Sequence, residues 1–151
     1  MKGLLDTHIL LYWLGADPRL SAAQAAVIQQ AIPSEPLWMA DISLWEIATL
    51  YTLGRITLNL PLQAWLEAAT ATPLVQRVGI LPAIAAAVAA LPAWFHRDPA
   101  DRILLTTAQI LELTLLTRDQ RILHAALVPT LAYGTISLLM TVYFGHRNHA
   151  P

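Results

Sequence analysis

The chain has 151 residues, enough for one domain with a sizeable hydrophobic core. Hydrophobic residues make up 56% of it and charged residues only 13%, so we expect some apolar surface to face another protein, either a second copy or a different partner. A net charge of −1 excludes a basic field over the whole surface, and the absence of cysteine excludes disulfides and thiolate metal sites. Asp6 interrupts the first apolar run and residues 131–144 are too short to span a bilayer, so we expect a soluble, cytoplasmic protein.

Short apolar segments alternate along the chain with longer helical patterns. The apolar segments have the length of buried strands and lie at residues 2–6, 37–40, 74–80, 114–117 and 128–132. Helical patterns lie at residues 7–15, 21–32, 43–53, 61–71, 82–91, 98–113 and 120–125. This alternation predicts an α/β fold, a three-layer α/β/α sandwich with a central, mostly parallel five-stranded sheet.

Two of the helix starts carry local capping patterns. Asp98 precedes Pro99 and Asp101, an arrangement typical of an N-cap followed by proline at the first helical position. Ser43 and Glu46 have the spacing of a capping box, with Ser43 as the cap and Glu46 at the third helical position. Each of these acids therefore has a simple structural interpretation as a group that satisfies free backbone N–H groups.

Half of the ten acidic residues fall where one end of the sheet and the starts of helices are expected to meet. Asp6 and Asp119 lie at or just past the C-terminal ends of apolar strands, and ligands bind beyond the carboxyl ends of strands in open α/β sheets. Glu46, Asp98 and Asp101 lie in first turns of helices. Carboxylates gathered in this way repel one another, and a hard divalent cation such as Mg²⁺ or Mn²⁺ offsets that repulsion. Such a site can activate water for attack on a phosphodiester.

Other residue types near these acids have two interpretations each. Four of the nine basic residues flank the acid motifs and could contact phosphate or simply pair with the acids: Arg97, Arg102, Arg118 and Arg121. The hydroxyls of Thr7 and Thr117 could hold a carboxylate or a water molecule. Trp13, Trp38 and Trp45 lie inside apolar patterns, where packing in the core is more common than base stacking.

Four segments together resemble the successive motifs of PIN domains, and in particular the VapC toxins of bacterial type II toxin–antitoxin pairs. These segments are residues 4–8, 43–47, 96–102 and 116–119, and the similarity covers residues 2–131. The resemblance implies a parallel five-stranded sheet and a Mg²⁺- or Mn²⁺-dependent endoribonuclease that cleaves RNA with metal-activated water. It also implies a homodimer and inhibition by a cognate antitoxin.

The resemblance also implies which residues form the site. The catalytic, metal-binding acids map to Asp6, Glu46, Asp101 and Asp119. Asp101 takes the third place because the family pattern runs from this acid into an apolar helix with alanine seven positions later, here Ala108. The accessory residues are Asp98, Thr7 and Thr117. The candidates for contact with RNA phosphate are Arg97, Arg102 and Arg118.

The chain departs from the family pattern in two places. The subgroup often carries lysine on the helix after its second acid, where this chain has Thr49, Leu50 and Tyr51. Residues 132–151 also continue beyond the PIN-like domain of residues 1–131, as an extension of unassigned role. These departures and the low charge leave open a different function. The chain would then be a module that binds an antitoxin and that itself has little or no nuclease activity.

Overall fold

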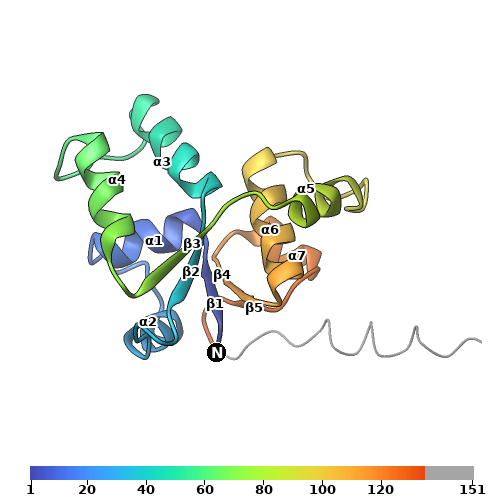
Figure 1. The fold of residues 1–151 in the computed structure, drawn as a ribbon, viewed down its shortest axis with the longest axis horizontal. Coiled ribbons are helices and arrows are strands. Elements are labelled where there is room, and N and C mark those ends of the chain that lie inside the picture. The colour runs from blue at the N-terminus through green and yellow to red at the C-terminus, as the bar shows by residue number, and fades with distance from the viewer. Residues whose placement is uncertain (135–151) are drawn as a thin grey trace, which may run out of the picture.

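Five short strands form one sheet in the computed structural model, which describes residues 1–134 (Figure 1). The strands are β1 (Gly3–Leu5), β2 (Leu37–Ala40), β3 (Val75–Val78), β4 (Thr114–Leu116) and β5 (Thr130–Leu131). Every neighbouring pair is parallel, and the order across the sheet is β3-β2-β1-β4-β5. The predicted five-stranded sheet is confirmed, and it is fully parallel. Because β1 lies between β2 and β4, the residues that follow these three strands are neighbours at one edge.

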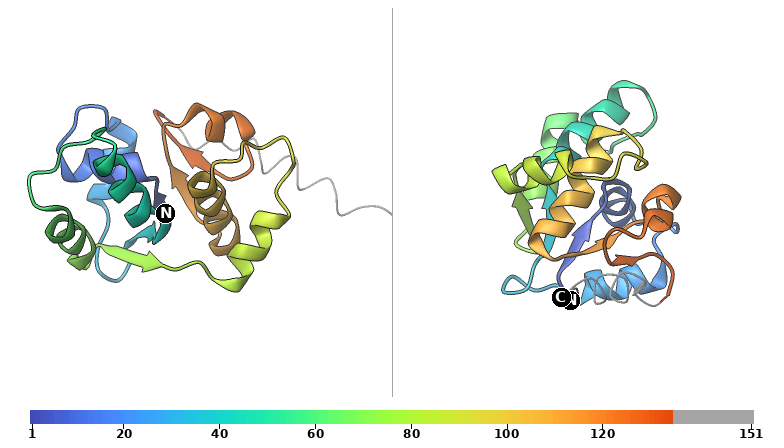
Figure 2. Two further views of the ribbon diagram at one scale, coloured as in Figure 1. Left: turned by 90° about the horizontal axis from the view of Figure 1, so that it is seen from above. Right: turned by 90° about the vertical axis from the view of Figure 1, so that its right-hand side faces the viewer.

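Seven helices of the described residues cover the sheet in two layers, as the views in Figure 2 show. One layer contains α1 (Thr7–Leu14), α2 (Ala22–Gln29), α3 (Ile42–Thr52) and α4 (Leu62–Ala71). The other contains α5 (Pro82–Ala89), α6 (Pro99–Leu111) and α7 (Gln120–Ala125). This arrangement confirms the three-layer sandwich. None of the helices in residues 1–134 is long and apolar enough to cross a membrane.

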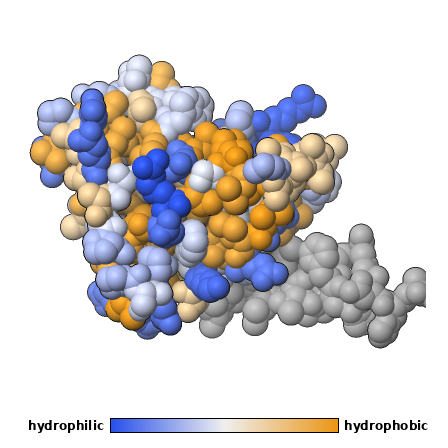
Figure 3. Space-filling model, viewed as in Figure 1, coloured by the Kyte–Doolittle hydropathy of each residue, from blue (hydrophilic) through white to orange (hydrophobic). Residues whose placement is uncertain are grey.

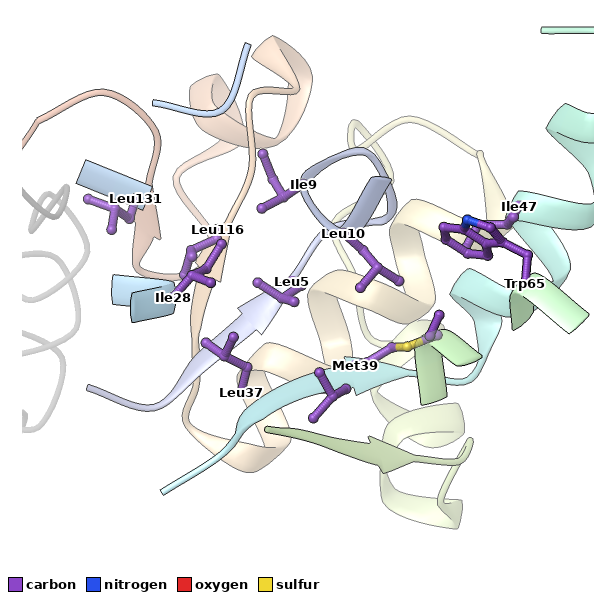
Figure 4. Close-up of a cluster of buried hydrophobic side chains, with 12 residues drawn as sticks. Leu5, Ile9, Leu10, Ile28, Leu37, Met39, Ile47, Trp65, Leu116 and Leu131 are labelled. Carbon is purple, nitrogen blue, oxygen red and sulfur yellow. The ribbon is translucent and has the colours of Figure 1, made fainter. Parts of the chain in front are cut away.

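Successive residues of the central strands point into opposite layers, so each strand serves two hydrophobic cores. Leu5 packs with Ile9, Leu10 and Met39 in the core under α1 to α4, which Figure 4 shows in close-up. Its neighbour Leu4 belongs to the core under α6 and α7. All these side chains are fully buried, and each contributes about 1.5–3 kcal/mol relative to exposure. The sheet edge that carries the acids is thus held from both faces.

The helix starts agree with the sequence patterns in one of the two predicted cases. Asp98 is the N-cap of α6, and its Oδ1 accepts a hydrogen bond of 3.2 Å from the backbone N–H of Asp101. The capping box at Ser43 and Glu46 is wrong, because α3 begins at Ile42 and its N-cap is Asp41, two residues before Ser43. Ser43 is buried there and accepts a hydrogen bond of 2.8 Å from the Thr7 hydroxyl. A contact between helices therefore overrides the local capping pattern.

A buried glutamine ties α2 to the ends of two strands. The Gln24 side chain is fully buried, and its Nε2 donates to the backbone oxygens of Thr117 and Leu131 at 3.1 and 2.9 Å. Its Oε1 accepts from the backbone N–H of Ser21, which completes a capping box at the start of α2. The carboxyl ends of β4 and β5 are thereby fixed next to the acid-rich edge. Most of the predicted extension, residues 135–151, lies outside the described residues.

Candidate functional site

A cavity of about 280 Å³ opens at the carboxyl edge of the sheet, between the starts of α1, α6 and α7 and one side of α3. Five acidic residues contribute to its lining: Asp6, Glu46, Asp98, Asp101 and Asp119. The remaining lining residues are His8, Trp45, Thr49, Leu50, Leu53, Arg55, Pro99 and Arg121. The structure therefore brings together all four acids predicted to act in catalysis, and the accessory Asp98 with them.

Asp6 directly follows β1 and lies at the base of this cavity with only 5% of its surface exposed. Its Oδ2 accepts a short hydrogen bond of 2.6 Å from the Thr117 hydroxyl. Burial raises the pKa of Asp6 to about 6, and the charges of Glu46 and Asp119 add to the rise, against the opposing effects of the Thr117 hydrogen bond and His8. Asp6 is thus a fixed carboxylate whose negative charge is unfavourable unless a cation lies nearby.

Glu46, Asp98 and Asp101 form the tightest group of acids. One carboxylate oxygen from each lies within 4.8 Å of the others, a spacing that a single metal ion could bridge. Burial raises the pKa of Asp101 to about 7, and repulsion from Asp6, Asp98, Asp119 and Glu46 contributes. Asp98 has two roles in this geometry, because one oxygen caps α6 while the residue also lines the cavity.

Arg121 partly offsets this negative charge. Asp119 caps α7 by accepting a hydrogen bond of 2.8 Å from the backbone N–H of Arg121. The Arg121 guanidinium also lies 3.2 Å from Asp119 Oδ2 and 3.3 Å from Asp101 Oδ2. Burial alone would raise the pKa of Asp119, but its hydrogen bonds to Arg121 and the guanidinium charge outweigh burial and lower it. The sequence places Arg121 near the acids, but the PIN resemblance does not assign it to the site.

His96 lies beside the same acids. Its Nε2 is 3.2 Å from Asp101 Oδ2, yet the atoms are not aligned for a hydrogen bond, and both ring nitrogens are buried without a partner among residues 1–134. Burial and the nearby Arg121 lower the pKa of His96. A neutral ring next to the acids therefore contributes no compensating charge. Arg55 and His8 also line the cavity. His8 belongs to the first PIN-like segment but was not predicted as a site residue, and Arg55 has no sequence signal beyond its residue type.

The three arginines predicted to contact RNA phosphate have different surroundings. Arg97 is exposed and makes no hydrogen bond or ion pair within the described part of the chain. Arg102 donates to the backbone oxygens of His96 and Phe95 at 2.8 and 2.7 Å, which holds the loop before α6. Arg118 donates to the backbone oxygen of Arg19 and to the Tyr133 hydroxyl. Their contact with phosphate stays a prediction.

Two of the other sequence interpretations are revised by the structure. The Thr117 hydroxyl does hold a site carboxylate, whereas the Thr7 hydroxyl donates to Ser43 and links α1 to α3. Trp13 and Trp38 are partly buried, but the expectation that Trp45 packs in the core is wrong, since 56% of its surface is exposed. With α3 starting at Ile42, Ser43 and Ile47 face inward and Trp45 faces the cavity.

The donors of the site fit a hard divalent cation. All five acids offer carboxylate oxygens, the ligands that Mg²⁺ and Mn²⁺ prefer, and no thiolate is available in a chain without cysteine. Burial first, and repulsion between the carboxylates second, raise the pKa values of Asp6 and Asp101, so the charged forms of both acids are unfavourable in this cavity. A bound cation removes that repulsion, so the arrangement favours metal binding.

The PIN domain family model matches residues 3–127 of this chain. The chain belongs to the PIN domain family. Within the family, it is 39% identical over 119 residues to Ribonuclease VapC22 of Mycobacterium tuberculosis, a match that covers 79% of this chain and 88% of the relative. The resemblance to VapC-type PIN domains is therefore confirmed.

Solved structures share the PIN fold at lower identity. A chain of the VapBC2 complex from Rickettsia felis, bound to promoter DNA, superposes with a TM-score of 0.64 at 13% identity, covering 87% of this chain and 98% of that chain. FitAcB from Neisseria gonorrhoeae superposes with a TM-score of 0.62 at 20% identity, and the match covers 87% of this chain and 96% of that chain. A chain of a toxin–antitoxin complex from Klebsiella pneumoniae superposes with a TM-score of 0.58 at 20% identity, and the match covers 84% of this chain and 95% of that chain. At these identities the likeness concerns the fold alone.

Proposed function

We propose that this PIN domain protein is a metal-dependent endoribonuclease, a hydrolase that cleaves RNA phosphodiesters, and the toxin of a toxin–antitoxin pair. The observation that carries the proposal is the meeting of Asp6, Glu46, Asp101 and Asp119 in one cavity from four separate segments. A protein without metal chemistry gains nothing from gathering carboxylates that raise one another's pKa. The relative named Ribonuclease VapC22 supports the same activity.

We assign the metal ion to Asp6, Glu46, Asp101 and Asp119, and we expect Mg²⁺ or Mn²⁺ because all four ligands are carboxylates. When bound, the cation polarises the scissile phosphate and activates water for attack. Asp98 adds a fifth negative charge, with a carboxylate oxygen within 4.8 Å of oxygens of Glu46 and Asp101. It also caps α6. None of these roles needs a nucleophile from the protein.

The remaining residues of the site orient the acids and attract the substrate. Thr117 fixes one oxygen of Asp6, and Asp98 holds the start of α6 and with it the position of Asp101. Arg121 and Arg55 line the cavity and provide positive charge for the RNA backbone. Because RNA is the substrate, the activity belongs in the cytoplasm.

The toxin role needs protein partners, and two surfaces outside the acidic cavity are suited to bind them. Figure 3 shows a broad area of hydrophobic residues beside hydrophilic ones on one face, over α5 and α6. A second cavity of about 700 Å³ runs between α1 and residues 54–59, and its lining combines Tyr12, Leu14 and Trp65 with Arg19. We assign this cavity to the antitoxin and the apolar area to a second copy of the chain, in a homodimer. Sedimentation of the purified protein tests the homodimer.

The test of the nuclease compares two aspartates that follow neighbouring strands. Asp6→Asn removes an acid of the cavity, whereas Asp41→Asn changes the residue after β2, whose carboxylate pairs with Arg77 at 2.8 Å outside the cavity. We expect Asp6→Asn to abolish Mg²⁺-dependent cleavage of RNA and to weaken Mg²⁺ binding in titration calorimetry, with both retained in Asp41→Asn. If Asp6→Asn cuts RNA as fast as the wild type, the assignment is wrong. An antitoxin-binding module without nuclease activity would show no binding of Mg²⁺ that depends on these acids.

A further inference from the structure

Trp45 is an exposed aromatic side chain at the wall of the acidic cavity. It is 56% exposed although it lies in α3, near the start of the helix, between the buried residues Ser43 and Ile47. Among the ring–ring and cation–ring contacts of residues 1–134, none involves Trp45. Leaving a large apolar ring in water is unfavourable, so its position next to the site calls for an explanation.

The wall around Trp45 differs chemically from the rest of the cavity lining. Leu50 and Leu53, from the end of the same helix and just beyond it, also line the cavity, and Leu53 is 58% exposed. Arg55 lies at the end of this segment. The rest of the lining, by contrast, holds five carboxylates together with His8, Pro99 and Arg121. One cavity thus offers an apolar wall, a positive charge and a set of metal-binding acids, while a phosphate group alone needs no apolar wall.

We propose that Trp45 stacks on a base of the RNA next to the scissile phosphate, with Leu50 and Leu53 completing an apolar surface for that nucleotide. This proposal rests on the proposed function and specifies its substrate as RNA that is unpaired at the cleavage site. Each RNA nucleotide combines an apolar base face with a charged phosphate, which matches the wall and Arg55. Trp45 directly precedes Glu46, so a stacked base lies beside the cation-binding acids.

The requirement for unpaired RNA follows from geometry. In a duplex, both faces of each base are covered by its neighbours, so an aromatic side chain can stack only on a base that is single-stranded or turned out of the helix. Stacking accepts any base, since all bases have an aromatic face. Trp45 therefore selects the conformation of the RNA more strongly than its sequence.

The experiment combines two substitutions at Trp45 with a change in the RNA. Cleavage of a short single-stranded RNA by the wild type first identifies the scissile bond. The same RNA is then made with an abasic site at each flanking nucleotide in turn. We expect Trp45→Ala to raise KM about 10-fold, equivalent to ~1.4 kcal/mol and within the range for base stacking, with kcat little changed. Trp45→Phe should recover most of this loss because it keeps an aromatic face.

The abasic RNA separates stacking from a structural effect. For the wild type, one abasic position should raise KM by a similar factor, whereas Trp45→Ala should show no further loss at that position. The matched control is Trp94→Ala, because Trp94 is 66% exposed but does not line the cavity. Quenching of tryptophan fluorescence by the uncleaved RNA, measured in EDTA, should occur in the wild type and in Trp94→Phe but not in Trp45→Phe.

The outcomes distinguish this proposal from the proposed function. If the wild type cleaves RNA while Trp45→Ala has an unchanged KM and the same response to abasic positions, stacking is refuted and the nuclease stands. If RNA quenches the fluorescence of Trp45 but is not cleaved, stacking stands and the nuclease is refuted. If Trp45→Ala changes only the sedimentation of the protein, the ring belongs to a protein interface and stacking is refuted.

Discussion

The acidic cavity should make the metal-free protein less stable as pH rises, and Asp101→Asn should remove the part of this loss that Asp101 causes. Burial and the surrounding carboxylates raise the pKa of Asp101 from 3.8 to about 7. The folded protein therefore keeps this proton up to about pH 7, whereas the unfolded chain releases it near pH 4. Since the folded state binds more protons in this interval, the free energy of unfolding falls as pH rises through it. The interval of about three pH units corresponds to at most ~4 kcal/mol, at about 1.4 kcal/mol each.

We expect Asp101→Asn to be about 1–3 kcal/mol more stable than the wild type at pH 8 in EDTA, because asparagine carries no charge and keeps an oxygen for the Arg121 guanidinium. Urea denaturation followed by circular dichroism measures the difference, which should shrink toward pH 4. Asp17→Asn is the control of opposite sign, because Asp17 pairs with Arg19 on the surface and its pKa is lowered to about 2. The wild type should be the more stable of that pair above pH 4 and lose this advantage as pH falls toward 2. A difference for Asp101→Asn that stays constant from pH 4 to 8 would refute the reasoning.

Three further predictions concern the surroundings of the site. Gln24→Leu should lower the free energy of unfolding by about 2–4 kcal/mol in urea titrations, because it removes the donors to the Thr117 and Leu131 carbonyls; an unchanged midpoint would contradict this. Thr117→Val should weaken Mg²⁺ binding in calorimetry and slow cleavage, and both effects should be larger at pH 6 than at pH 8. The reason is that the pKa of Asp6 rises further when its hydrogen bond is lost. An equal effect at both pH values would argue against this. Mg²⁺ at about 100 times its Kd should stabilise the wild type by about 2.7 kcal/mol, and a similar gain in Asp6→Asn would contradict the assignment of the metal site.

The arrangement of the acids could be predicted from sequence because it depends on the direction of the strands. Asp6 and Asp119 follow apolar strands, and parallel strands end at the same edge, so their approach needed no knowledge of side-chain contacts. The Asp98 cap was equally local. The PIN resemblance then singled out the four acids, with Asp98 as an accessory, from the ten in the chain.

The features that could not be predicted depend on contacts between distant segments. Ser43 carries a capping pattern, but a hydrogen bond from Thr7, 36 residues away, occupies its hydroxyl. The N-cap of α3 is Asp41 instead of Ser43, and Trp45, expected in the core, forms part of the cavity wall. Likewise, the contacts of Gln24 with strands about 100 residues away leave no trace in the residues around it.

The hydrogen bond from Thr117 to Asp6 joins two side chains that each come directly after a central strand. The alignment of β1 with β4, with Leu5 opposite Leu116, therefore sets the position of an atom that faces the reaction. We expect a substitution in the interior that shifts one strand slightly against the other to leave the protein folded yet deprive it of toxicity. Loss-of-toxicity variants selected in cells should accordingly include changes deep in the sheet, far from any residue that touches RNA.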